Sequence, residues 1–171
     1  MKIVTIFAHH LYAFSFKDKT DELNRLYDFW TNQKLLRAYF EKNNSVLEFE
    51  NIDIEEAISE TIENAELLFE LLSEHKNDLD RLFEALSTKE NDSKFLHKQK
   101  SRRKWLRLYA IKIESNYYVI TGGAIKQSQT MQQHPDTNEE SKKLEFCRNY
   151  LIDNHVFDAD SFNDFLYELE F

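Results

Sequence analysis

Basic residues gather between residues 94 and 112, a stretch with eight lysines and arginines and no acidic residue. The rest of the chain holds all 31 acidic residues and only 14 of the 22 basic ones, and the formal net charge is −9. Aromatic residues adjoin the basic stretch, and single-stranded RNA requires cations for its phosphates and ring faces for its bases. We therefore predict that nucleic acid binds here, through Lys98, Lys100, Arg102, Arg103, Lys104 and Trp105.

A second interpretation of the same stretch involves no ligand. An edge strand and a loop can be kept soluble by their own charges, and the acidic helices of this chain could supply matching carboxylates. Alternation along the predicted strand places Trp105, Arg107 and Tyr109 on one face, but it does not decide whether that face is open. The sequence leaves both interpretations open.

The familiar catalytic motifs are missing from the sequence. It has no P-loop, no glycine fingerprint for dinucleotides, no cysteine spacing for a metal and no nucleophile elbow. His9 and His10 are neighbours on a predicted strand, so they point to opposite faces and cannot easily share one ion. His97 and His134 could each act as an acid or a base near neutral pH, and each is also ordinary for a loop. We expect no metal and no cofactor.

Composition bounds the class of protein. A length of 171 residues with 42% hydrophobic residues suits one domain with a sizeable core, and two glycines and one proline favour long helices over a many-turned β fold. No apolar run is long enough to span a membrane, and residues 1–16 lack the layout of a signal peptide. A single cysteine, Cys147, on the apolar side of a predicted helix suggests a buried structural thiol. We expect a cytoplasmic protein with no membrane partner.

Hydrophobic periodicity gives the order of the elements. Residues 2–16 are predicted to form one long strand or a hairpin bent at His9-His10, and residues 88–101 a polar loop. Five helices are predicted. The first covers 21–43 with a kink at Thr31-Asn32, the second begins at a cap at Asp53, and the third covers 79–86. The fourth begins at a capping box formed by Thr137 and Glu140, and the fifth begins at about residue 159.

A hairpin is predicted over 104–127, with a tight turn at Glu114-Ser115-Asn116. Gly122-Gly123, inside its second strand, predicts a bulge or a close approach of another segment. The fold class is therefore α+β, with a small antiparallel sheet packed with about five helices.

The hairpin sequence is also familiar. Its first strand (106–113) carries Arg107, and after a short turn its second strand (118–127) carries a glycine segment followed by Lys126. This pattern resembles the central strands of RelE/ParE-superfamily toxins, most of all the HigB-like, phage-derived branch. A polar stretch and a helix follow, as they do in that branch, and the upstream order of a strand and then helices is similar. The likeness covers about residues 104–151.

The resemblance implies a toxin of a type II toxin–antitoxin system that cleaves messenger RNA without a metal, often on the ribosome. Its implied partners are RNA or the ribosome and a helix-turn-helix antitoxin that blocks the basic face. The implied catalytic residues are Arg107 and Lys126, with Tyr109 or His134 for proton transfer. It also implies a single RelE-like domain over 1–171 with a helical insertion at about 46–90.

Two other functions compete with this one. The chain could be a non-enzymatic protein that binds a protein partner through its acidic helices. It could also be a phage- or defence-associated regulator that binds nucleic acid without cleaving it.

Overall fold

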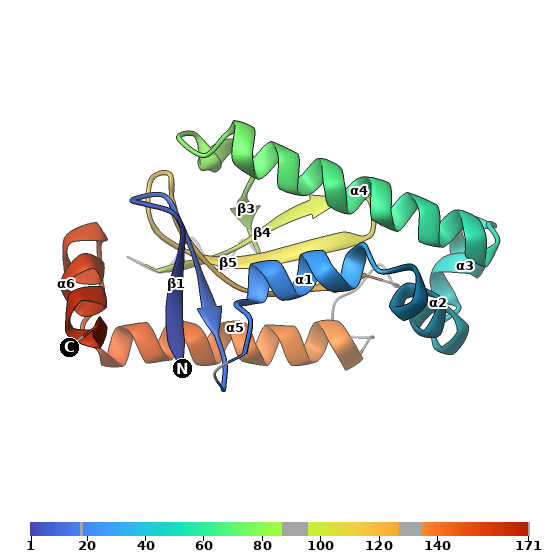
Figure 1. Ribbon diagram of the computed structural model, residues 1–171. Coiled ribbons are helices and arrows are strands. Elements are labelled where there is room, and N and C mark those ends of the chain that lie inside the picture. Colours follow the sequence, from blue (N-terminus) through green and yellow to red (C-terminus); the bar gives the residue numbers. More distant parts are fainter. Residues whose placement is uncertain (18, 87–95, 127–134, 171) are drawn as a thin grey trace.

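The computed structural model describes residues 1–17, 19–86, 96–126 and 135–170, apart from the side chains of residues 45, 46 and 135–137. Within these residues a six-stranded sheet lies between helices, which confirms the predicted α+β class (Figure 1). The strands follow the order β1-β2-β6-β5-β4-β3 across the sheet. They are β1 (Lys2–Phe7), β2 (Leu11–Ser15), β3 (Glu84–Ala85), β4 (His97–Arg103), β5 (Leu106–Glu114) and β6 (Tyr117–Ile125).

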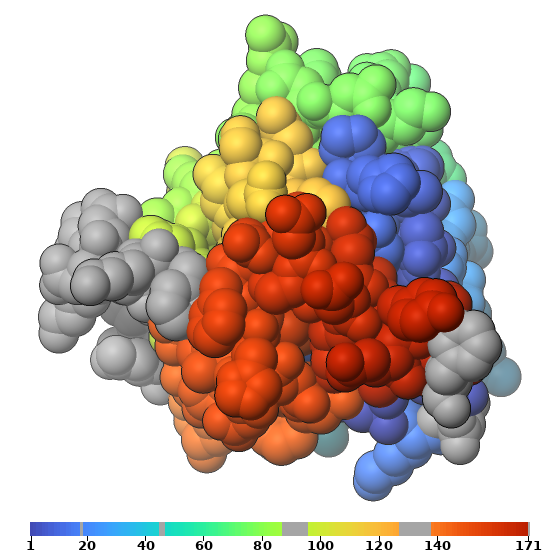
Figure 2. All heavy atoms as spheres, turned by 90° about the vertical axis from the view of Figure 1, so that its left-hand side faces the viewer, coloured from blue at the N-terminus to red at the C-terminus, as the bar shows by residue number. Residues whose placement is uncertain are grey.

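Helices cover both faces of the sheet. One face carries α1 (Glu22–Trp30), α2 (Gln33–Lys42), α3 (Ser45–Glu50) and α4 (Ile54–Glu74), and the other carries α5 (Pro135–Asp153) and α6 (Ala159–Glu170). Each helical layer encloses its own core, with Leu108 and Ile120 in the first and Ile111 and Val119 in the second. Strands β5 and β6 are therefore buried on both faces. Figure 2 shows α6 at one end of the molecule, beside the turn between β5 and β6.

The predicted bend at His9-His10, the predicted turn after Glu114 and the predicted cap at Asp53 are confirmed. The chain turns at His9, where φ is 67°, so β1 and β2 form a hairpin. The predicted kink is a break, because α1 and α2 are separate helices on either side of Thr31-Asn32. Asp21 caps α1 and Asp53 caps α4, each through a side-chain oxygen that accepts a main-chain N–H three residues ahead.

Four predictions about the elements are wrong. The sheet is mixed, since β2 runs parallel to β6. The predicted loop at 88–101 ends in β4, and the predicted helix at 79–86 is a short 3₁₀ helix, η1 (Leu79–Arg81), followed by β3. Helix α5 begins at Pro135, so Thr137 lies within its first turn and is not its cap. Strand β4 was missed because the residues it buries, Gln99 and Ser101, are polar.

Asp80, within η1, contacts the end of β5, the β5–β6 turn and the start of β6. Its carboxylate accepts hydrogen bonds from the Ser115 hydroxyl (2.6 Å), the Tyr118 hydroxyl (2.6 Å) and the Asn116 N–H (3.0 Å), and Lys112 lies 3.3 Å away. Burial acts to raise the pKa of Asp80, but these partners together lower it to about 2. The β5–β6 turn is thereby tied to η1.

Gly122 and Gly123 show both features predicted for them. The β5–β6 register shifts between Tyr109 and Ala110, which pair with Gly122 and Ile120. A Cβ at Gly122 would lie 2.0 Å from the Glu140 carboxylate of α5, and one at Gly123 would lie 2.6 Å from the Arg107 carbonyl oxygen. The missing side chains therefore let α5 approach β6 from one face and α1 from the other.

We predict that Gly123→Ala destabilises the protein more than Gly122→Ala. At 123 the new methyl group meets a backbone oxygen and Leu26 at 2.8 Å, neither of which can move cheaply, so we expect a loss of about 2–3 kcal/mol. At 122 it meets the end of one flexible side chain, Glu140, and we expect a loss of about 1 kcal/mol. Urea unfolding of both variants measures the difference.

Removing the obstructing carboxylate serves as the control. Glu140→Ala should restore stability to Gly122→Ala and not to Gly123→Ala. Equal losses in the two single variants would contradict this account of the packing.

Candidate nucleic-acid interface

Four cationic side chains share one face of the sheet where β4 and β6 end and β5 begins. In the strand register Lys100 pairs with Tyr109, and Arg107 pairs with Arg102 on one side and Ala124 on the other. Directly paired side chains lie on the same face, and Tyr109 and Ala124 belong to the core under α5. Lys126 follows Ala124 by two residues, and its N–H continues the ladder to the Trp105 carbonyl at 2.7 Å. We call Lys100, Arg102, Arg107 and Lys126 the cationic cluster.

The members of the cationic cluster influence one another electrostatically. Burial lowers the pKa of Lys126, and Arg107, Lys100 and Arg102 lower it further. Burial likewise lowers the pKa of Arg107; Arg102 adds to that effect, while Tyr109 and Glu84 oppose it. The four cations lie close enough to repel one another, and a bound anion would relieve that repulsion.

Arg107 is held in place by the backbone around it. Its Nη1 donates to the carbonyl oxygens of Lys104 (2.6 Å) and Leu106 (2.9 Å). A guanidinium fixed in this way loses little side-chain entropy when it binds a phosphate. Beside the cluster, a hollow of about 200 Å³ is lined by Lys100 and Arg102 together with residues 81–84.

Internal ion pairs divide the described cations of the basic stretch, together with Lys126, into two sets. In the first set each cation lies within 4 Å of a carboxylate of this chain: Lys98–Glu145 (2.9 Å), Lys104–Glu60 (2.6 Å), Lys112–Asp80 (3.3 Å) and Arg102–Glu84 (3.5 Å). In the second set no such carboxylate is found among the residues the structure describes, and its members are Lys100, Arg103, Arg107 and Lys126. The interpretation without a ligand therefore applies to the first set, and nucleic-acid binding by the second set stays a prediction.

Neither predicted ring is open to a ligand. Trp105 is 4% exposed, and its indole Nε1 donates to the Thr61 hydroxyl at 3.0 Å. Tyr109 is 2% exposed, and burial raises the pKa of its hydroxyl to about 12. The prediction that Trp105 and Tyr109 share one face is wrong, because Trp105 belongs to the core under α4 and Tyr109 to the core under α5. Helices cover both rings.

Of the two candidate histidines, the structure describes His97, which pairs with Lys112 near the far end of β4, away from the cationic cluster. His134 lies outside the described residues.

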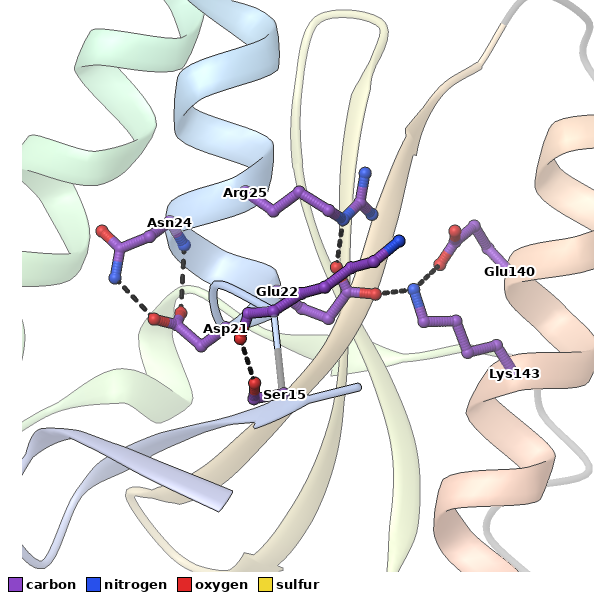
Figure 3. Close-up of polar contacts among 8 residues, drawn as sticks. Ser15, Asp21, Glu22, Asn24, Arg25, Glu140 and Lys143 are labelled. Atoms are coloured by element: carbon purple, nitrogen blue, oxygen red, sulfur yellow. Dashed lines mark hydrogen bonds and ion pairs between the residues drawn. The ribbon is translucent and has the colours of Figure 1, made fainter. Parts of the chain in front are cut away.

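Next to the cluster lies a buried group of charges that sequence reasoning missed (Figure 3). Glu22, 3% exposed at the start of α1, forms ion pairs with Lys143 of α5 and with Arg25, and Lys143 also lies 3.6 Å from Glu140. These pairs join α1 to α5 across β6. The Glu22–Arg25 spacing is visible in the sequence, but nothing there connects residue 22 with residue 143.

Comparison with known proteins adds no assignment. The chain matches no family model, no curated protein and no solved structure. No group of three or more potential metal ligands occurs within residues 1–17, 19–86, 96–126 and 135–170, and no helix in those ranges is both long and apolar enough to cross a membrane. The site must therefore be interpreted from its own residues.

We predict that Arg107→Gln raises the pKa of Lys126, because it removes the cation that repels the Lys126 ammonium most strongly. Arg102→Gln should have a smaller effect in the same direction. NMR titration of labelled lysine side chains measures both. Arg103→Gln is the matched control and should leave the Lys126 pKa unchanged. An equal effect of all three variants would show that only net charge matters.

Proposed function

We propose that this chain is a metal-independent endoribonuclease, the toxin of a type II toxin–antitoxin system. The observation that supports this most is the cationic cluster, in which Arg107 and Lys126, the two residues singled out by the likeness to RelE-like toxins, share a face with Lys100 and Arg102. A concentrated positive charge on a rigid sheet suits an RNA backbone.

The proposed reaction uses the 2′-hydroxyl of the RNA as the nucleophile. The 2′-oxygen attacks the adjacent phosphorus, the bond from phosphorus to the 5′-oxygen breaks, and the products carry a 2′,3′-cyclic phosphate and a 5′-hydroxyl. One proton leaves the 2′-hydroxyl and one is supplied to the departing 5′-oxygen, so the proton count is balanced.

Each step has a candidate group in the cationic cluster. Lys126, whose pKa is lowered, accepts the proton of the 2′-hydroxyl when it is neutral. Arg107 and Arg102 stabilise the extra negative charge of the five-coordinate phosphorus. Lys100 donates the proton to the leaving oxygen, a role that the buried Tyr109 hydroxyl is poorly placed to fill. Because a base acts in its unprotonated form, the rate should rise as pH increases through the pKa of Lys126.

Induced expression in a bacterial host tests the proposal. We predict that the intact chain arrests growth and that Lys126→Ala and Arg107→Ala each abolish the arrest, since each removes a group that acts on the transferred phosphate. Lys142→Ala, an exposed position of α5 outside the cluster, removes the same charge and should leave the arrest intact. Normal growth at high expression, with cellular RNA uncleaved, would contradict the proposal.

A non-enzymatic function has one observation in its favour. Helix α4 exposes a row of glutamates to solvent: Glu55, Glu56, Glu63, Glu66, Glu70 and Glu74. Of these, Glu55 pairs with Arg37 at 2.5 Å. Such a face suits a basic protein partner. This function would be favoured if a protein partner still co-purifies after the cationic cluster is neutralised but no longer does so after the glutamates of α4 are replaced.

A further inference from the structure

A second feature lies on the outer edge of β6, on the side away from β5. Strand β2 pairs with β6 over Tyr118, Val119 and Ile120. Beyond that point the edge of β6 faces a cavity of about 220 Å³, bounded by α1 and α2 on one side and the start of α5 on the other. We call this cavity the edge pocket.

The edge pocket combines aromatic rings with carboxylates. Phe29 and Tyr39 contribute partly exposed rings, which meet edge to face with centroids 5.9 Å apart, and the ring of Trp30 is fully buried. Arg25 also lines the pocket, and its guanidinium pairs with Glu22. Glu139 and Glu140 contribute the carboxylates from the first turns of α5. A planar ligand with hydrogen-bond donors on its edge could stack on the rings and donate to the carboxylates.

The backbone of β6 supplies a third kind of group. Because the Lys126 N–H donates to Trp105 on β5, the alternation of an antiparallel ladder turns the polar groups of Gly123 and Ile125 the other way, towards the pocket. Main-chain N–H and C=O groups here can form hydrogen bonds with the edge of a base. The cavity is smaller than the roughly 300–1,000 Å³ of pockets for drug-sized ligands, which suits a single ring system.

We propose that the edge pocket receives one guanine base of the bound RNA, an inference that rests on the proposed function. Guanine presents two neighbouring donors, N1–H and the N2 amino group, to a carboxylate, and its O6 accepts from a main-chain N–H. The rings provide a surface for stacking, with each stacked base contributing about 1–3 kcal/mol. No other standard base offers that pattern of donors and acceptor.

The position of the pocket links base recognition to cleavage. Ile125 lines the pocket and Lys126 of the cationic cluster follows it directly, while Ala124 lines the pocket and pairs with Arg107. Consecutive residues of one strand would thus hold a base and its phosphate. The proposed enzyme therefore cleaves next to guanine.

The glycine content of the chain offers a direct probe. The chain has two glycines, so protein labelled with [¹⁵N]glycine gives amide signals from Gly122 and Gly123 alone, and Gly123 lines the pocket. Millimolar guanosine 5′-monophosphate should shift the Gly123 signal. Inosine 5′-monophosphate, which lacks the N2 amino group, should bind about tenfold more weakly.

Two variants test the walls of the pocket. Phe29→Ala should reduce binding about tenfold by removing a ring. Glu139→Gln replaces an exposed side chain and should remove the preference for guanosine over inosine without unfolding the protein. Glu168→Gln on α6, at the other end of the molecule from α2 (Figure 1), makes the same chemical change and should alter neither the affinity nor the preference for guanosine.

The outcomes separate this inference from the proposed function. If RNA binds and is cleaved but no nucleotide shifts the Gly123 signal, the pocket assignment is wrong and the nuclease proposal stands. Equal binding of guanosine, inosine and adenosine monophosphates would also overturn the assignment. If guanosine monophosphate shifts the signal in wild type and in Lys126→Ala while RNA stays intact, the pocket assignment stands and the nuclease proposal fails.

Discussion

The close approach of two helices to one strand determines the rest of this structure. At Gly122 and Gly123, β6 carries no side chains, and α5 and α1 come so near that a single methyl group would overlap the Glu140 carboxylate on one face or Leu26 on the other. Packing at this density leaves little room to adjust. The end of β6, the start of α5 and the end of α1 are therefore fixed relative to one another, and both the edge pocket and Lys126 lie where they meet.

That arrangement places two groups of charges near each other at the end of β6. Glu22, Lys143 and Glu140 form a buried group, in which ion pairs offset a large desolvation cost. The cationic cluster gathers charges of one sign; burial lowers the pKa values of Arg107 and Lys126, and neighbouring cations lower them further. Repulsion of this kind reduces stability unless an anion binds, and such strain is common at functional sites.

Features governed by neighbouring residues could be predicted from the sequence, and those governed by distant partners could not. The hairpin, its turn and the bulge at Gly122 follow from local turn chemistry and alternation. The burial of Trp105 depends on Thr61, 44 positions away, and the Glu22–Lys143 pair spans 121 positions. Strand β4 escaped prediction because its buried side chains are polar, so its pairing rests on main-chain hydrogen bonds that leave no hydrophobic pattern.

The most direct test of the account is the chemistry of the RNA ends. Purified protein should be incubated with guanine-containing single-stranded RNA in the presence of EDTA, with and without ribosomes, and the products should be analysed by mass spectrometry. The account predicts cleavage without metal that yields 2′,3′-cyclic phosphate and 5′-hydroxyl ends, and no cleavage by Lys126→Ala. RNA that stays intact under both conditions, or cleavage that requires Mg²⁺ and leaves 5′-phosphates, would contradict it.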